Sequence, residues 1–269
     1  MRMALRVGDK QQTFMSSSWG LATVIRVEEV KTETRSGLMV YHRYEDVGYD
    51  TQGIFVEDGV VLDSQFSERR GRSGIPPEYV YCMGRSVDWG KYGSENMEPQ
   101  KKIVNAFVTN FNAFRREGRG LYLYSHTKGS GKTMIACSVA NEILKIHDIS
   151  VKFINEADYI ELVRARDDVS RETVKSIFEA GLLILDDIGA QDTGKDWITT
   201  ALFRLVDRRY TNHLPTIFTS NVRMEDLKTD SRITDRIYAV SVPVIMPEVN
   251  VRNQIADRHT KEFLKNILS

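Results

Sequence analysis

The chain has 269 residues, enough for one or two domains with a buried core. Lysine and arginine together number 37, as do aspartate and glutamate, so the net charge is zero and no overall basic field indicates nucleic-acid binding. The two cysteines, Cys82 and Cys137, lie outside any CxxC pair, which excludes a cysteine-built zinc module and argues against a disulfide framework. We find no signal-peptide core and no apolar run of membrane-spanning length, and we therefore expect a cytoplasmic protein without membrane contact.

Residues 1–66 predict a small β-rich domain. Three segments are rich in Val, Ile, Tyr and Phe, and turns at Arg35-Ser36-Gly37 and Asp58-Gly59 break the stretch, a pattern typical of an antiparallel sheet. The segments are 21–30, 37–44 and 53–63. His42 belongs to no ligand pattern, and we expect it to be structural.

Residues 67–98 predict a linker and lead-in. The stretch 67–77, SERRGRSGIPP, is charged, contains glycine and proline and lacks periodicity, as in a solvated linker. Phosphate contact by Arg69, Arg70 and Arg72 is the alternative. Beyond this point the sequence predicts one further domain, 99–269, which opens with a helix over 101–116 that carries an apolar stripe.

A strand, a glycine-bearing loop and a helix follow one another around Gly131-Lys132-Thr133. Residues 121–124 predict a short buried strand, and an apolar helical run begins near Lys132. Gly129 and Gly131 lack Cβ atoms, so the backbone amides can surround a di- or triphosphate while the helix directs its positive end at the same anion. In this pattern Lys132 reaches the β- and γ-phosphates and Thr133 offers a hydroxyl to Mg²⁺.

The first glycine of the G-x-x-x-x-G-K-[ST] pattern is missing. His126 takes its place, or Ser125 if the loop is one residue longer. A chance GSGKT turn at a helix N-terminus is the alternative interpretation. The predicted nucleotide-binding residues are Ser125, His126, Thr127, Lys128, Gly129, Ser130, Gly131, Lys132, Thr133 and Met134.

A second strand is predicted over 151–154, followed by helices over 155–163 and 170–180, one helix more than a minimal crossover requires. Four basic residues lie on or between these helices. A solvated charged face explains them, and contact with a single-stranded nucleic-acid backbone is the alternative. They are Arg164, Arg166, Arg171 and Lys175.

Segment 182–187, LLILDD, is a continuous apolar run that ends in two carboxylates, as in a buried parallel strand whose carboxyl end faces a ligand. We predict that Asp186 holds Mg²⁺ through water and that Asp187 orients the attacking water. The alternative is that the two acids merely cap a turn.

The next helix is predicted over 196–212, with Trp197, Ala201, Leu205 and Val206 on its apolar side. Asn221 follows a strand over 215–220. Its side-chain amide can form a hydrogen bond there with the γ-phosphate or with the attacking water. The alternative is that Asn221 is simply a turn residue.

A helix over 231–237 places Arg232 and Arg236 on one face, and a fifth strand over 240–245 precedes a last helix, 249–268, with Arg252 in its first turn. This leaves no room for a full C-terminal helical lid. We therefore expect self-association through the ATP site, with Arg232 or Arg236 supplied by a neighbouring subunit.

Taken together, LILDDIGAQ, LFRLVDRRY, PTIFTSN and SRITDRI resemble the DnaC/DnaI group of helicase loaders and the related IstB transposition ATPases, from about Gly74 onward. The resemblance implies an AAA+ P-loop fold of the α/β class, with a five-stranded parallel sheet in the order 5-1-4-3-2 and an extra helix pair after strand two. It places the family's nucleotide-loop residues at Gly129, Gly131, Lys132 and Thr133. The acidic pair that holds Mg²⁺ and orients water falls on Asp186 and Asp187, and the first sensor, which is the polar residue that senses the γ-phosphate, falls on Asn221. Arg236 best matches the arginine finger, with Arg232 second, and Arg252 matches the second sensor.

The resemblance implies ATP or ADP and Mg²⁺ as cofactors, and a replicative hexameric DNA helicase and single-stranded DNA as partners. Many loaders carry an N-terminal zinc module, whereas residues 1–66 contain no cysteine, so the partner of that segment stays open. The leading hypothesis is an ATP-dependent helicase loader. The alternatives are an IstB-like transposition helper and a slowly hydrolysing adaptor that binds its partner through the N-terminal sheet.

Overall fold

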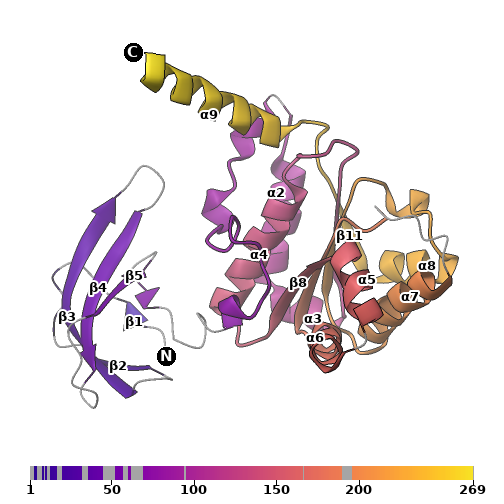
Figure 1. Cartoon of the computed structure of the whole chain (residues 1–269), viewed down its shortest axis with the longest axis horizontal. Helices are drawn as coiled ribbons and strands as arrows, with labels where there is room; N and C mark the ends of the chain where they lie inside the picture. The colour runs from indigo at the N-terminus through magenta and orange to yellow at the C-terminus, as the bar shows by residue number, and fades with distance from the viewer. Residues whose placement is uncertain are drawn as a thin grey trace. The chain divides into compact units, whose positions relative to one another are not determined.

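The computed structural model describes residues 3–4, 8, 10, 13–16, 20–31, 36–44, 52–56, 60–61, 69–93, 95–165, 167–189 and 196–268. The chain divides into two compact units, Met1–Gly71 and Arg72–Ser269 (Figure 1).

The first unit contains a four-stranded antiparallel sheet in the order β2-β3-β4-β5, which confirms the predicted β-rich segment. Val24, Val40 and His42 are buried in it, and burial lowers the pKa of His42, which keeps its ring neutral at pH 7. A second, two-stranded sheet pairs β1 with β6. The strands are β1 (Met3–Ala4), β2 (Thr13–Ser16), β3 (Gly20–Lys31), β4 (Ser36–Tyr44), β5 (Gln52–Val56) and β6 (Val60–Val61).

The second unit is built on a five-stranded parallel sheet in the order β11-β7-β10-β9-β8, which numbered along the chain is the predicted 5-1-4-3-2. The three central strands, β7, β9 and β10, are buried along their whole length, as expected for a parallel sheet covered on both faces. The strands are β7 (Gly120–Tyr124), β8 (Val151–Asn155), β9 (Leu182–Asp186), β10 (Thr216–Ser220) and β11 (Ser241–Ile245).

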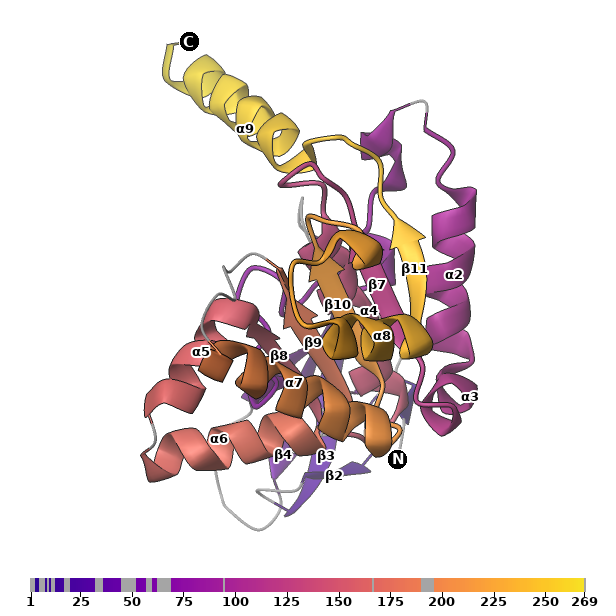
Figure 2. The same cartoon turned by 90° about the vertical axis from the view of Figure 1, so that its right-hand side faces the viewer.

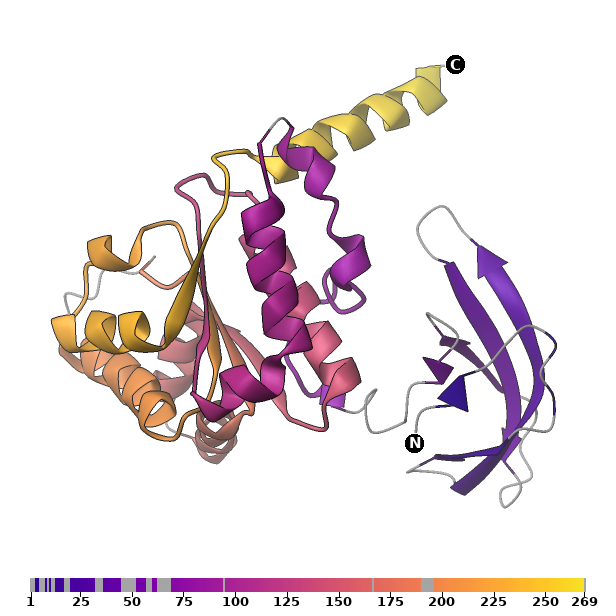
Figure 3. The ribbon, with the colours of Figure 1, turned by 180° about the vertical axis from the view of Figure 1, so that it is seen from behind.

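Helices cover both faces of this sheet. Helix α4 (Lys132–Ile146) lies on one face and α2 (Glu98–Thr109) contacts both α4 and the edge strand β11 (Figures 2 and 3). The other face packs against α5 (Glu156–Ala165), α6 (Asp168–Glu179), α7 (Asp196–Thr211) and α8 (Ser231–Val240). The α5–α6 pair confirms the extra helices predicted after the second strand, and α9 (Val251–Leu268) follows β11. Short 3-10 turns are η2 (Gly84–Ser86), η3 (Trp89–Tyr92) and η4 (Met224–Asp226).

The single helix predicted over 101–116 is two helices, α2 and α3 (Phe111–Arg116). They are separated at Asn110, whose side-chain amide donates a hydrogen bond to the carbonyl of Ala106 at 3.1 Å. An asparagine side chain that takes a backbone carbonyl in this way competes with helix continuation.

Two further expectations are wrong. Ser73 and Ile75 are buried rather than part of a solvated linker, because the carbonyl of Ser73 accepts a hydrogen bond from the amide of Phe153 in β8 at 2.7 Å. Trp197 is 42% exposed, whereas Ala201 and Leu205 on the same helix are buried as predicted. It lies in the first turn of α7, at the margin of the apolar face.

Arg209 on α7 is the largest of the fully buried side chains, at 2% exposure. Its guanidinium donates to the carbonyls of Ile177, Ala180 and Pro215 and to the hydroxyl of Thr216 at distances of 2.7–3.1 Å. Burial lowers the pKa of Arg209 to about 9. One cation thus joins the end of α6 to the start of β10, and the negative end of the α6 dipole favours it.

We predict that Arg209→Met lowers the free energy of unfolding by about 3 kcal/mol, because several buried carbonyls lose their donor together. Urea unfolding followed by circular dichroism measures this. The matched control is Arg208→Met at the neighbouring exposed position, which should cost less than about 1 kcal/mol. Equal midpoints for the two variants would contradict the assignment of Arg209 as the tie between α6 and β10.

Candidate nucleotide-binding site

The loop between β7 and α4 depends on two glycines with positive φ. Gly129 has φ +76° and Gly131, the N-cap of α4, has φ +89°. A Cβ atom on Gly131 would lie 2.8 Å from the hydroxyl oxygen of Tyr92, and one on Gly129 would lie 2.7 Å from Oδ1 of Asn250. Both backbone conformation and space therefore require glycine here.

The missing first glycine causes no backbone strain. Among the described residues, only Asp187 and His213 combine a side chain with positive φ, so His126 adopts a conformation open to any residue. The carboxylate of Glu248 holds this part of the loop. It accepts hydrogen bonds from the amides of His126 at 2.9 Å and Thr127 at 2.6 Å, and from the hydroxyl of Ser125 at 3.1 Å.

Lys132 is 5% exposed and its ammonium lies inside the curl of the loop. It donates hydrogen bonds to the carbonyls of Ser125 and Thr127, each at 3.2 Å, and to the hydroxyl of Ser130 at 3.1 Å. Burial lowers the pKa of Lys132, and the nearby carboxylates, Asp187 foremost, oppose that shift. The loop therefore concentrates a positive charge where the α4 N-terminus also favours anions.

The two halves of the predicted motif meet directly. The hydroxyl of Thr133 donates to the carboxylate of Asp186, with oxygen–oxygen distances of 2.9 and 3.2 Å, although 53 residues separate them. Asp186 is 7% exposed, and burial raises its pKa while hydrogen bonds from Thr219 and Thr133 oppose the rise. A hydroxyl and a carboxylate oxygen at one point are ligands suited to Mg²⁺, with phosphate and water completing the shell.

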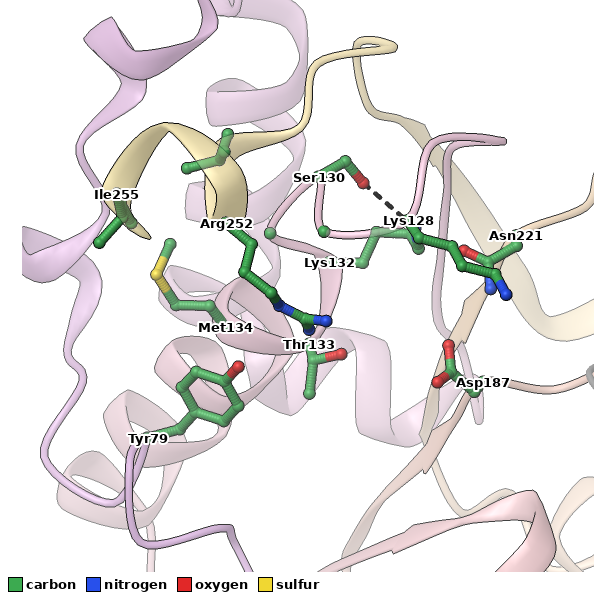
Figure 4. Close-up of a pocket in the computed structure, with 13 residues that line it drawn as sticks. Tyr79, Lys128, Ser130, Lys132, Thr133, Met134, Asp187, Asn221, Arg252 and Ile255 are labelled. Atoms are coloured by element: carbon green, nitrogen blue, oxygen red, sulfur yellow. Dashed lines mark hydrogen bonds between the residues drawn. The ribbon is translucent and has the colours of Figure 1, made fainter. Parts of the chain in front are cut away.

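Asp187 and Asn221 lie on the far side of the same opening (Figure 4). Asp187 has φ +54°, and its carboxylate is exposed to the cavity. Oδ1 of Asn221 is buried and has no hydrogen-bond partner among the residues that the structure describes. An orphaned acceptor at the tip of β10 fits a site in which a bound water or ligand supplies the donor.

The cavity formed by these elements has a volume of 290 Å³. One end is polar, formed by the glycine loop, and the other is lined by Tyr79, Met134 and Ile255 (Figure 4). Val251 also lines the cavity. Arg252 extends from the first turn of α9 between the two ends, and its amide donates to the carbonyl of Gly129 at 3.0 Å. Phosphates at the polar end and a base at the apolar end match the two ends of a nucleotide.

The sequence analysis did not find four residues of this site, namely Tyr79, Glu248, Val251 and Ile255. Glu248 and Ile255 come from the chain that follows β11, and Tyr79 comes from the segment assigned to the lead-in. None belongs to a local motif. Only the burial of that lead-in against α4, where Asn141 donates to the carbonyls of Tyr79 and Cys82, places Tyr79 at the cavity.

The sequence matches the family described as "IstB-like ATP binding protein" over residues 98–240, just over half of the chain. The chain belongs to this family of ATP-binding proteins. It is 26% identical over 176 residues to the replicative helicase loader DnaI of Bacillus subtilis, a match that covers 58% of this chain and 56% of DnaI. It is 25% identical over 115 residues to the phage-like element PBSX protein XkdC of the same organism, covering 41% of this chain and 43% of XkdC.

The IstB-like chain thus spans about half the length of the curated relatives it matches. A crystal structure of DnaI superposes with a TM-score of 0.55 at 24% identity, covering 65% of this chain and 96% of that one. The initiator DnaA, solved with AMPPCP and single-stranded DNA, superposes with a TM-score of 0.52 at 18% identity, covering 70% of this chain and 56% of DnaA. These structures share the fold of this chain's parallel-sheet unit.

The two candidate finger arginines of this IstB-like protein do not line its own cavity. On α8, Nε of Arg236 donates to Asp207 at 2.6 Å, while Nε and Nη2 of Arg232 both donate to Asp230. Both guanidinium groups lie 4.7 Å from the centre of the Phe203 ring.

The candidate DNA contacts lie on α5 and α6. Arg164 is 3.6 Å from Glu161, and Arg171 is 2.9 Å from Asp168. Arg171 and Lys175 line a second cavity of 520 Å³ between the two helices. Arg166 lies outside the described residues.

Within the described part of the chain, no helix is both long and apolar enough to cross a membrane. The same part contains no group of three or more His, Cys, Asp or Glu side chains placed to hold a metal ion. A magnesium ion at Thr133 and Asp186 would therefore depend on phosphate and water for its other ligands.

We predict a pH-dependent contribution of Glu248 to stability. Burial alone would raise its pKa, but the hydrogen bonds from Thr127, His126 and Ser125 outweigh burial and lower it. The stabilisation is therefore present above the ordinary glutamate pKa and is lost as pH falls through the lowered value. Glu248→Gln should lower the thermal midpoint at pH 7, and this difference from wild type should shrink progressively as the pH falls below the ordinary glutamate pKa.

The control for this measurement is Glu172→Gln, on the exposed side of α6. Its difference from wild type should be small across the same pH range. A Glu248→Gln deficit that stays constant down to pH 3 would show that the carboxylate charge does not hold the loop.

Proposed function

We propose that this chain is an ATPase that loads a ring-shaped replicative helicase onto single-stranded DNA, with hydrolysis controlling assembly and release. The contact between Thr133 and Asp186 at the mouth of the glycine loop is the observation that carries the ATPase part. The loader part is supported by similarity to a relative described as a replicative helicase loader.

The phosphates of ATP would lie against the amides of Gly129 to Lys132 at the start of α4. Lys132 would exchange carbonyl partners of its own loop for oxygens of the β- and γ-phosphates, so little new desolvation is needed. Thr133 and Asp186 would hold Mg²⁺, which when bound offsets the phosphate charge. The glycine cradle fits the phosphates, the oxygens of Thr133 and Asp186 fit Mg²⁺, and the orphaned oxygen of Asn221 fits a water molecule that donates to it.

Asp187 would orient water in line with the γ-phosphorus and accept its proton as the water oxygen bonds to phosphorus. The bond to the bridging oxygen then breaks, and ADP and phosphate leave. Asn221 would bond the water or the γ-phosphate, and Arg252 would contact the phosphates from the opposite wall of the cavity.

Arg236 would complete the site of a neighbouring subunit. Its own cavity is out of reach, and its guanidinium is held by Asp207 and packed between the rings of Phe203 and Tyr210. Such a preorganised cation loses little freedom on binding a phosphate. Arg232 is less suited, because both of its bonded donors go to the carboxylate of Asp230, whereas Arg236 gives one donor to a carboxylate and one to the carbonyl of Arg232.

The helix pair α5–α6 would contact the single strand through Arg164, Arg166, Arg171 and Lys175, and the N-terminal sheet would bind the helicase. Two other functions use the same nucleotide site. A transposition helper is supported by the family match to IstB-like proteins. A slowly hydrolysing adaptor is supported by the aspartate at position 187, where such ATPases usually carry glutamate.

We predict trans-complementation between two inactive variants. Lys132→Ala should lose nucleotide binding, while Arg236→Ala should bind ATP normally but hydrolyse it about 10³-fold more slowly. Mixing the two should restore part of the turnover, because Lys132→Ala supplies a finger to an intact Arg236→Ala site. Steady-state phosphate release at fixed total protein measures this.

Arg232→Ala is the matched control and should retain most of its turnover. Two outcomes would contradict the role of Arg236 in a neighbouring subunit's site. One is an Arg236→Ala variant that hydrolyses ATP at the wild-type rate, and the other is a mixture no more active than its components. Asp187→Asn separates the adaptor from the ATPase, since only an adaptor keeps its full function with that change.

We predict ATP-dependent co-sedimentation with the replicative helicase of the same cell, and retention of single-stranded DNA by the complex. The double variant Arg171→Glu, Lys175→Glu should still bind the helicase. Its affinity for single-stranded DNA should fall, and that affinity should depend less steeply on salt concentration. If no ATP-sensitive helicase complex forms while turnover is normal, the loader function fails and the transposition helper becomes the better hypothesis.

A further inference from the structure

Thr219 occupies a position beneath the site that no motif assigns. It is the fourth residue of β10, is fully buried, and lies two residues before Asn221. Its hydroxyl donates to Oδ1 of Asp186 at 2.5 Å and accepts a hydrogen bond from the amide of Asp187 at 2.9 Å. Its carbonyl accepts from the amide of Ile188 at 2.9 Å. One residue therefore holds three consecutive residues at the end of β9.

A threonine hydroxyl has one hydrogen to donate. Since that hydrogen is given to Asp186, the lone pairs face the amide of Asp187, and the orientation of the hydroxyl is fixed by both partners. Asp186 is buried and shares its carboxylate between only two hydroxyls that the structure shows, Thr133 and Thr219. Each of these bonds compensates the burial of a charge, so neither is incidental.

The backbone of Asp187 also needs support. A residue with a side chain at φ +54° persists only where its surroundings fix it. Thr219 accepts hydrogen bonds from the amide of Asp187 itself and from the amide of the next residue, Ile188, so the peptide groups on both sides of the strained position are held. Two further side chains support the residues that follow Asp187. The hydroxyl of Ser220 donates to the carbonyl of Ile188, and the carboxylate of Glu156 accepts from the amide of Gly189.

We propose that Thr219 is a positioning residue for ATP hydrolysis. It sets the spacing between the carboxylate that holds Mg²⁺ and the carboxylate that orients water, and it ties both to the strand that carries Asn221. This role rests on the proposed ATPase function. Thr219 contacts neither nucleotide nor metal and acts through Asp186 and Asp187.

Packing and positioning predict opposite orders of effect for two substitutions. Thr219→Val keeps the shape and the β-branch but removes the hydroxyl, whereas Thr219→Ser keeps the hydroxyl and removes a methyl group. A residue needed only for packing tolerates valine better than serine. If the hydroxyl positions the two carboxylates, the serine variant should retain ATP hydrolysis and the valine variant should lose most of it.

The experiment uses the full chain, with ADP affinity in EDTA as the control and three readouts, namely Mg²⁺ dependence, turnover and amide exchange at Asp187. For Thr219→Val we expect ADP affinity in EDTA within about twofold of wild type, since the glycine loop is untouched. We expect the half-saturating Mg²⁺ concentration for nucleotide binding to rise about tenfold and turnover to fall about 10²-fold. Amide hydrogen exchange at Asp187 without nucleotide should accelerate, because its acceptor is gone. Thr219→Ser should stay within about threefold of wild type in all three.

Thr219→Ala provides the comparison if the valine variant does not fold, because alanine and serine at this position differ only by the hydroxyl. Unchanged Mg²⁺ dependence and Asp187 exchange in the valine and alanine variants would overturn the inference, as would equal impairment of the serine variant. Failure of the wild-type chain to bind nucleotide with Mg²⁺ would instead overturn the proposed function itself.

Discussion

The hydrogen bond between Thr133 and Asp186 is the contact on which the rest of the site depends. Thr133 lies in the first turn of the helix that follows β7, and Asp186 ends β9, yet these strands are not neighbours, because β10 lies between them. The helix α4 must therefore cross the end of β10 to bring its first turn over β9. That crossing is possible because parallel strands all end at the same edge of the sheet, where the dipole of α4 also meets the carboxylates.

Support for this contact comes from two directions. From below, β10 supplies Thr219, whose hydroxyl joins both acids at the end of β9. From the C-terminal side, the chain after β11 is joined to the glycine loop by the Glu248 carboxylate and by the amide of Arg252 on the carbonyl of Gly129. The glycine loop and the start of α9 are thereby joined by a hydrogen bond.

Three arginines of the second unit, Arg209, Arg236 and Arg252, have different surroundings. Arg209 is buried against carbonyls and joins α6 to β10, whereas Arg236 on the outer face of α8 is paired yet still 27% exposed. Arg252 alone among these three lines the cavity. The chain thus carries the candidate nucleotide cavity, and Arg236 is not among the residues that line it.

The sequence by itself determined the elements whose chemistry is local. The glycine loop, the apolar run ending in Asp186 and Asp187, and Asn221 after the fourth strand follow from spacing and period, and all line or adjoin one cavity. The strand order 5-1-4-3-2 came from family resemblance, since a parallel strand looks the same at any place in the sheet. Only the tertiary structure assigned Glu248, Thr219 and Tyr79, buried the segment around Ser73 and divided the helix at Asn110. The first four of these features depend on hydrogen bonds between residues far apart in the chain, which leave no periodic trace in the sequence. The division at Asn110 depends on a local bond to Ala106 that competes with an otherwise continuous apolar stripe.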